Sequence, residues 1–221
     1  MFSNIKAVIF DLDGLVIDSE TSYIRAWQQA ADAMGHDMSH IDFGLLNGAD
    51  GKRVEQQIRD WFGGQFDLNQ FREHSSALWR RQVEAEGIAV KWGFAETITL
   101  IKTLNWPYAL ATNSRQAQAL YLLENAGLSG VFEHIIGRDQ VENPKPAPDL
   151  FLQAARRLTV QPSQCLVLED SATGVAAALA AGMRCCFIPS RLPANTEATH
   201  QAHAVFDDLS QLTAAIQQSR L

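Results

Sequence analysis

An α/β fold, with a parallel sheet and a helical insertion, is the class that this 221-residue sequence predicts. The first observation is a β-branched and aromatic run at residues 5–10 (IKAVIF), which is typical of a fully buried strand. The second is an alternation of strand-like and helix-like segments after Gly93. Strands that alternate with helices indicate a parallel sheet covered on both faces.

The block between the first strand and residue 88 has a different character. Its apolar residues recur at helical spacing, as in Leu78, Trp79 and Val83, and five glycines between residues 44 and 64 mark its breaks. It therefore predicts several helices and no strand. We expect a core domain of residues 1–17 and 89–221 and a helical domain of residues 18–88.

The alternating region predicts the remaining elements in order. Helices are expected at 95–104, 115–125, 147–158, 172–181 and 209–218. Strands are expected at 108–111, 134–136, 165–168, 185–188 and 204–206. Gly127 and Gly182 follow two of these helices, as glycine often does at a helix C-terminus.

Composition argues against several classes of protein. The hydrophobic fraction of 47% is enough for a sizeable core, and the net charge of -7 disfavours a broad nucleic-acid surface. No apolar run of about 18 residues predicts a membrane span. Cys165, Cys185 and Cys186 form no Cys-x-x-Cys pair, so reduced thiols in a cytoplasmic protein fit best. No obligate protein partner is evident.

Polar residues follow the expected strands, and ligands of open parallel sheets bind beyond the carboxyl ends of their strands. Asp11 and Asp13 follow the first strand, and residues 112–114 follow the second. Lys145 comes after the third, and residues 169–171 follow the fourth. Four acidic residues on one edge repel one another unless a cation lies among them. Oxygen ligands favour a hard cation such as Mg²⁺.

Each segment has a plainer explanation by itself. Paired aspartates beside a glycine can form a turn, and Thr-Asn-Ser or Glu-Asp-Ser before a helix can cap it. Lys145, between two prolines, could be a solvated loop residue. Caps alone explain neither the lysine nor Asp11, so the joint arrangement favours a catalytic site.

Four segments resemble the haloacid dehalogenase (HAD) superfamily, in its branch of phosphatases and β-phosphoglucomutases. They are DLDGLVIDSE at 11–20, LATNS at 110–114, NPKPAPD at 143–149 and LEDSATGVAAALAAGM at 168–183. They occur in the family's order and span nearly the whole chain. The resemblance implies a Rossmann-like core with an α-helical cap domain inserted after the first strand, in agreement with the interruption described above.

The resemblance also implies catalytic roles. Asp11 would attack phosphorus, and Asp13 would protonate the leaving oxygen and then deprotonate the hydrolytic water. Asp11, Asp170 and the backbone carbonyl of Asp13 would hold Mg²⁺, with Glu169 as a direct or an indirect ligand. Mg²⁺ and a lysine are needed because a carboxylate that attacks a phosphate dianion is otherwise repelled.

Phosphate binding is assigned in the same way. Thr112 and the backbone N–H of Asn113 would bind phosphoryl oxygens, and Lys145 would offset the charge of nucleophile and phosphate. The predicted cap would choose the substrate. In it, Lys52 and Arg53 could reach a second anionic group, although such side chains are more often solvated helix charges.

These implications predict a Mg²⁺-dependent phosphatase that hydrolyses small phosphorylated metabolites, with sugar phosphates as candidates, through an aspartyl-phosphate. The alternative within the family is a phosphosugar mutase of the β-phosphoglucomutase type. Tyr23 stands where those mutases carry a cap histidine, and Gly51 where they carry an arginine, so both departures disfavour it. A non-catalytic binding protein on the same scaffold is opposed by the intact set of acidic residues and lysine.

Overall fold

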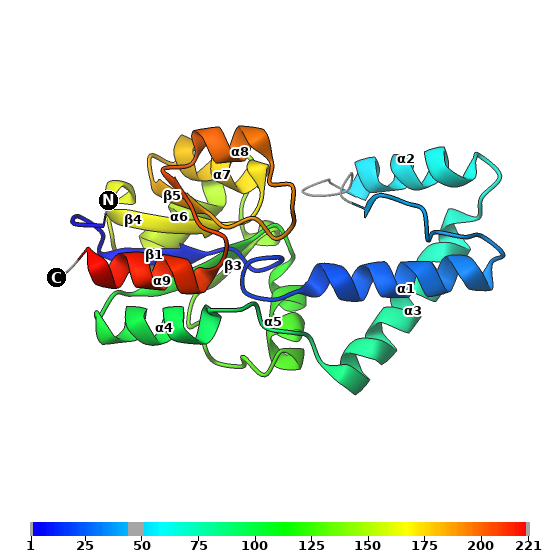
Figure 1. The fold of residues 1–221 in the computed structure, drawn as a ribbon, viewed down its shortest axis with the longest axis horizontal. Helices are drawn as coiled ribbons and strands as arrows, with labels where there is room; N and C mark the ends of the chain where they lie inside the picture. Colours follow the sequence, from blue (N-terminus) through cyan, green and yellow to red (C-terminus); the bar gives the residue numbers. More distant parts are fainter. Residues whose placement is uncertain (1, 44–50, 220–221) are drawn as a thin grey trace. The chain divides into compact units, whose positions relative to one another are not determined.

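The computed structural model describes residues 2–43 and 51–219, without the side chains of residues 51–53. It divides the chain into two compact units: Met1–Asp18 with Ala89–Leu221, and Ser19–Ile88. The second unit therefore interrupts the first directly after its first strand and the loop that follows (Figure 1). That the second unit serves as a cap stays a prediction.

A six-stranded parallel sheet forms the centre of the first unit, with the order β3-β2-β1-β4-β5-β6. The strands are β1 (Ala7–Phe10), β2 (Tyr108–Thr112), β3 (Ile135–Gly137), β4 (Cys165–Glu169), β5 (Arg184–Phe187) and β6 (Ala204–Val205). This is the order of a doubly wound sheet. From β1, strands β2 and β3 are added on one side and β4, β5 and β6 on the other, so the order of addition reverses between β1 and β4. The predicted α/β class with a Rossmann-like sheet is confirmed.

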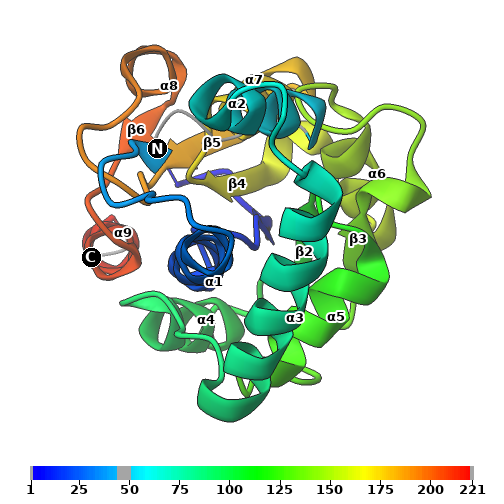
Figure 2. The same ribbon diagram turned by 90° about the vertical axis from the view of Figure 1, so that its right-hand side faces the viewer.

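Helices cover both faces of this sheet (Figures 1 and 2). One face carries α4 (Phe94–Thr103), α5 (Gln116–Asn125) and α9 (Leu209–Gln218), and the other carries α6 (Asp149–Leu158), α7 (Ala172–Ala180) and α8 (Thr196–Gln201). Short 3-10 turns lie at Arg138–Gln140 and Pro162–Gln164. The six-residue helix α8 is an element that the sequence pattern did not predict.

Alternate residues of β1 enter the cores on the two faces. Ala7 and Ile9 belong to the buried cluster that includes residues of α6 and α7. Phe10 meets the rings of Phe94 and Phe132 edge to face, with centroids 5.9 and 5.6 Å away. Every residue of β1 and β4 is buried because helices cover both faces. Their sequences are therefore continuous apolar runs up to the polar residues that end them.

The described part of the second unit contains α1 (Ser19–Ala33), α2 (Gly51–Phe62) and α3 (Leu68–Glu86), and no strand. The ring of Tyr23 on α1 stacks on Trp79 of α3, with centroids 4.6 Å apart and planes 9° apart. The indole N–H of Trp79 donates to the hydroxyl of Ser22 at 3.0 Å. These contacts join the two longer helices of the unit.

The side chains of Lys52 and Arg53 lie outside what the structure describes. Their proposed contact with a second anionic group therefore stays a prediction.

Candidate active site

The predicted site residues of the first unit lie at the carboxyl edge of the sheet. Asp11 follows β1, and its backbone N–H donates to the carbonyl of Leu168 in β4 at 3.0 Å. Thr112 ends β2 and Glu169 ends β4. Parallel strands end at the same edge, so these residues come together beside the point where the strand order reverses.

Lys145 reaches this edge from the loop before α6. Its ammonium donates to Asp11 Oδ1, to Glu169 Oε1 at 2.6 Å and to the carbonyl of Ala111 at 2.8 Å. Its side chain is 2% exposed. An ammonium has three N–H donors, and these contacts use all three. Lys145 is therefore an internal cation of the site, and the solvated-loop explanation is wrong.

Burial shifts the pKa values of the acidic groups. It raises the pKa of Asp11 to about 7, against the charge of Lys145, while the charges of Glu169 and Asp13 add to the increase. Burial, Glu169 and Asp11 likewise raise the pKa of Asp170 well above its ordinary value. Because desolvation and like charges both oppose ionisation, the site is one in which a cation would be stabilised.

The pKa of Lys145 moves in the opposite direction. Burial alone lowers it, but the charges of Asp11 and Glu169 raise it by more, so the net pKa is above its ordinary value. Lys145 is therefore charged at neutral pH and offers a permanent positive group beside Asp11.

Three carboxylates meet the geometric requirement for a metal. Asp11, Glu169 and Asp170 each present an oxygen, and these oxygens lie within 4.8 Å of one another. The donor set consists of hard oxygens, which suits Mg²⁺ or Ca²⁺ better than a soft metal. The residues present therefore fit a hard divalent cation.

Glu169 differs from the other two carboxylates. Its Oε1 accepts from Lys145, while its Oε2 accepts from the N–H of Asp170 at 3.0 Å and from the N–H and hydroxyl of Ser171 at 3.0 and 2.9 Å. A carboxylate has about four acceptor positions, and with three of these donors on Oε2 and one on Oε1, at most one position is left, on Oε1. This favours the indirect role that the sequence left open for Glu169.

Two glycines make room for these carboxylates. Gly14 has φ +88°, and a Cβ there would overlap Asp170 Oδ2. A Cβ at Gly174 would overlap the carboxylate of Glu169. The glycine of DLDG is thus required both for its backbone conformation and for the approach of Asp170.

The loop after β2 connects the other predicted residues. The hydroxyl of Thr112 accepts from the N–H of Ser114 at 3.0 Å. The side chain of Asn113 accepts from the N–H of Lys145 at 2.9 Å and donates to its carbonyl at 3.2 Å. The hydroxyl of Ser114 donates to Asp13 Oδ2 at 2.9 Å. The N-cap of α5 is Arg115, with no side-chain cap bond, so the plain capping explanation for this tripeptide is wrong.

Two residues that contact the catalytic candidates had no predicted part in the catalytic site. Ser190, in the loop after β5, is hydrogen-bonded to the Asp170 carboxyl. Ser171 both caps α7, by accepting from the N–H of Gly174 at 3.1 Å, and donates to Glu169. The capping explanation was therefore correct for Ser171, but it is only part of its role. A polar residue after a strand was the signal available for Ser190.

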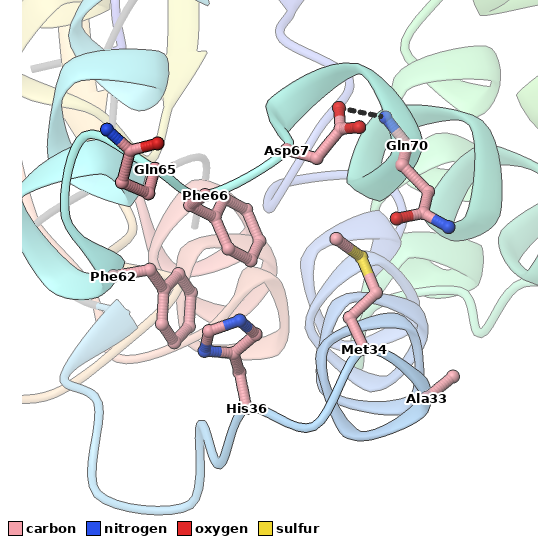
Figure 3. A pocket seen from close by; sticks show the side chains of 8 residues that line it. All are labelled: Ala33, Met34, His36, Phe62, Gln65, Phe66, Asp67 and Gln70. Carbon is pink, nitrogen blue, oxygen red and sulfur yellow. Dashed lines mark hydrogen bonds between the residues drawn. The ribbon is translucent and has the colours of Figure 1, made fainter.

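A separate cavity of about 320 Å³ lies in the second unit (Figure 3). The ring of His36 contacts those of Phe62 and Phe66, with centroids 5.0 Å away in each case. Asp67 in its wall caps α3 by accepting from the N–H groups of Asn69 and Gln70. The described residues that line it include no lysine or arginine. Among these described residues, none offers a phosphate ester the permanent positive charge of a lysine or an arginine.

A doubly wound sheet with acidic groups and a buried lysine gathered at its switch point is an arrangement typical of an α/β enzyme. The model of the haloacid dehalogenase-like hydrolase family matches residues 5–182, and the chain belongs to this family. The resemblance inferred from the four sequence segments is confirmed.

Named relatives agree with this assignment. The chain is 35% identical over 188 residues to the fructose-1-phosphate phosphatase YqaB of Escherichia coli (strain K12), which covers 83% of this chain and 96% of the relative. It is 30% identical over 178 residues to the phosphorylated carbohydrates phosphatase of Thermotoga maritima, covering 80% and 82%. These similarities confirm the predicted enzyme class, a phosphatase-type hydrolase.

Solved structures give the same fold. A putative β-phosphoglucomutase from Thermotoga maritima matches with a TM-score of 0.83 at 26% identity, over 97% of this chain and 99% of that one.

Among the described residues, no helix has both the length and the apolar character needed to cross a membrane.

Proposed function

We propose that this chain is a Mg²⁺-dependent phosphatase that hydrolyses small sugar phosphates through an aspartyl-phosphate on Asp11. The observation that carries the proposal is the buried contact of Lys145 with Asp11, beside Asp170 at the carboxyl edge of the sheet. The names of the relatives, which refer to fructose 1-phosphate and to phosphorylated carbohydrates, support this substrate class.

Asp11 is the proposed nucleophile because Lys145 binds one of its oxygens and so restricts the rotation of the carboxyl group. A positioned nucleophile at short range removes much of the entropic barrier to attack. Formation of a covalent intermediate then divides one difficult displacement into two easier ones. Lys145 remains charged throughout and offsets the charge that gathers on the phosphoryl oxygens.

Asp13 is the proposed general acid and base. The leaving oxygen of a sugar phosphate is strongly basic, so a proton donated by Asp13 assists its departure. Asp13 then accepts a proton from the water that attacks the aspartyl-phosphate. Thr112 and the N–H of Asn113 are proposed to bind the phosphoryl oxygens. The side chain of Asn113 is committed to the backbone of Lys145, so only its N–H serves this purpose.

Mg²⁺ is the proposed cofactor, held by Asp11, Asp170 and the backbone carbonyl of Asp13, with Glu169 orienting its neighbours. When bound, the cation neutralises the carboxylates and polarises the phosphoryl group. The residues of the second unit, 18–88 in the predicted division, are proposed to form a cap that selects the substrate and excludes water.

Purified protein with Mg²⁺ and a panel of phosphorylated metabolites, including fructose 1-phosphate, tests the proposal through released phosphate. Turnover of one or more sugar phosphates is expected, with none after treatment with a chelator and recovery on addition of Mg²⁺. Ca²⁺ should restore it poorly, because it accepts looser coordination than the octahedral geometry of Mg²⁺. Undiminished turnover in metal-free protein would contradict the proposal.

A phosphosugar mutase is the second candidate, because a putative β-phosphoglucomutase shares the fold over nearly the whole chain. Tyr23, at the position of the mutase histidine, stacks on Trp79 instead of offering an imidazole. A phenol hydroxyl does not offer the two ring nitrogens of histidine, so this departure disfavours the mutase.

Incubation with β-glucose 1-phosphate and a trace of the 1,6-bisphosphate separates the two candidates. We expect phosphate release to exceed formation of glucose 6-phosphate. Isomerisation faster than release by a factor of about ten, or roughly 1.4 kcal/mol in barrier height, would favour the mutase.

A further inference from the structure

Ser114 occupies a fixed place two residues beyond the end of β2. Its backbone N–H donates to the hydroxyl of Thr112 at 3.0 Å, and its carbonyl accepts from the N–H of Arg138 at 3.0 Å. Because both backbone groups have partners, the position from which its side chain projects is well defined. From there its hydroxyl donates to Asp13 Oδ2 at 2.9 Å, which joins two loops 101 residues apart in the chain.

We infer that Ser114 is a positioning residue for Asp13, an inference that rests on the proposed function of Asp13 as general acid and base. A carboxyl group rotates about its bond to Cβ unless a partner holds it. A hydroxyl held against Oδ2 restricts this rotation and so helps to set the direction in which the carboxyl group points. Proton transfer needs the carboxyl within hydrogen-bond reach of the leaving oxygen, so this restriction bears directly on its efficiency.

The reaction step that depends on this orientation is the first one. A carboxylate oxygen of Asp11 forms a bond to phosphorus, and the ester P–O bond breaks with its electron pair on the leaving oxygen. The proton of Asp13 moves to that oxygen. An alkoxide from a sugar needs this proton, whereas a p-nitrophenolate is weakly basic and departs without it. The contribution of Ser114 should therefore depend on the leaving group.

Steady-state kinetics with two substrates test this dependence. The value of kcat/KM covers the steps up to departure of the leaving group, so it isolates the first proton transfer. It is to be measured for a sugar phosphate that the wild type hydrolyses and for p-nitrophenyl phosphate. The variants are Ser114→Ala, which removes only the hydroxyl, and Ser114→Thr, which keeps one. The matched control is Ser210→Ala on α9, which removes a serine hydroxyl that donates to Asp208.

General acid catalysis is typically worth about 10²–10⁴-fold, and loss of orientation should remove part of it. Ser114→Ala is therefore expected to lower kcat/KM for the sugar phosphate about tenfold or more, with less than about a twofold change for p-nitrophenyl phosphate. Ser114→Thr should retain most of the activity on both substrates, and Ser210→Ala all of it. Inhibition by inorganic phosphate should be unchanged in Ser114→Ala, since Ser114 is assigned to Asp13 and not to the phosphoryl group.

Equal losses on the two substrates, weaker inhibition by phosphate, or no loss on either substrate would each overturn the inference while leaving the proposed function standing. A wild-type protein that hydrolyses neither substrate would instead overturn the proposed function. Thermal melting of each variant verifies that the protein is folded when the rates are compared.

Discussion

Among the described residues, the ion pairs of the two units lie in opposite environments. In the first unit, Lys145 contacts Asp11 and Glu169 with side-chain exposures of 2%, 10% and 0%. In the second unit, Arg25 and Glu86 form an ion pair at 2.8 Å with exposures of 52% and 61%. Burial of charges costs several kcal/mol of hydration, so a buried cluster is weak evidence for stability and stronger evidence for function.

Removal of the cation from each ion pair should produce the largest difference between the units. Lys145→Met leaves buried carboxylates without their counter-charge, so the metal-free variant should lose about 3–5 kcal/mol of unfolding free energy relative to metal-free wild type. With Mg²⁺ present, the variant should also lose its activity. The matched variant, Arg25→Ala, should lose at most about 1 kcal/mol, because water screens an exposed pair. Urea denaturation checks both, and equal losses from the two variants would remove the distinction.

Alanine substitution of one glycine in each unit should produce a difference of intermediate size between the units. Gly14 and Gly63 have φ values of +88° and +83°, so alanine at either position suffers similar backbone strain, of order 1–2 kcal/mol. Only at Gly14 would the new Cβ meet Asp170, whereas nothing lies within 4 Å of the position at Gly63.

Gly14→Ala should therefore lose metal-dependent activity, while Gly63→Ala should lose only stability. Phosphate release as a function of Mg²⁺ concentration, beside a thermal melt, measures the two effects. Normal Mg²⁺ dependence in Gly14→Ala would mean that Asp170 does not need its observed position.

The smallest expected effect on activity concerns the three buried cysteine thiols, which carry no charge. Burial raises the pKa of the Cys165 thiol to about 11 and that of Cys186 to about 12, and raises the pKa of Cys185 well above its ordinary value. The reactive thiolate is therefore scarce at pH 8. Folded protein should resist iodoacetamide at that pH without loss of activity, while urea-unfolded protein should react at all three positions. Rapid labelling of the folded protein would contradict the burial described here.

The sequence predicted best those features that depend on local pattern. The continuous apolar runs of β1 and β4 identified two central strands because both faces of the sheet are covered. Asp11, Lys145 and Asp170 could be found because parallel strands end at one edge, so position in the sequence determines position in space. Family resemblance supplied their proposed roles.

Features that depend on side-chain geometry could not be predicted in this way. The double hydrogen bond of Asn113 with Lys145 and the contact of Ser190 with Asp170 join segments far apart in the chain. Helix α8 was missed because six residues are too few for a hydrophobic period, although Asn195 caps it through the N–H of Ala198. Helix α6 begins at Asp149, two residues later than predicted, with Pro148 at its N-cap.

The central claim is that Asp11 becomes covalently phosphorylated, and reductive trapping tests it most directly. Borohydride added during turnover converts an aspartyl-phosphate to homoserine, which peptide mass spectrometry then locates in the chain. The account predicts homoserine at position 11 in the wild-type protein with substrate and Mg²⁺, and none in Asp11→Asn, which should also release no phosphate. Wild-type turnover without homoserine at residue 11, or phosphate release by Asp11→Asn near the wild-type rate, would contradict it.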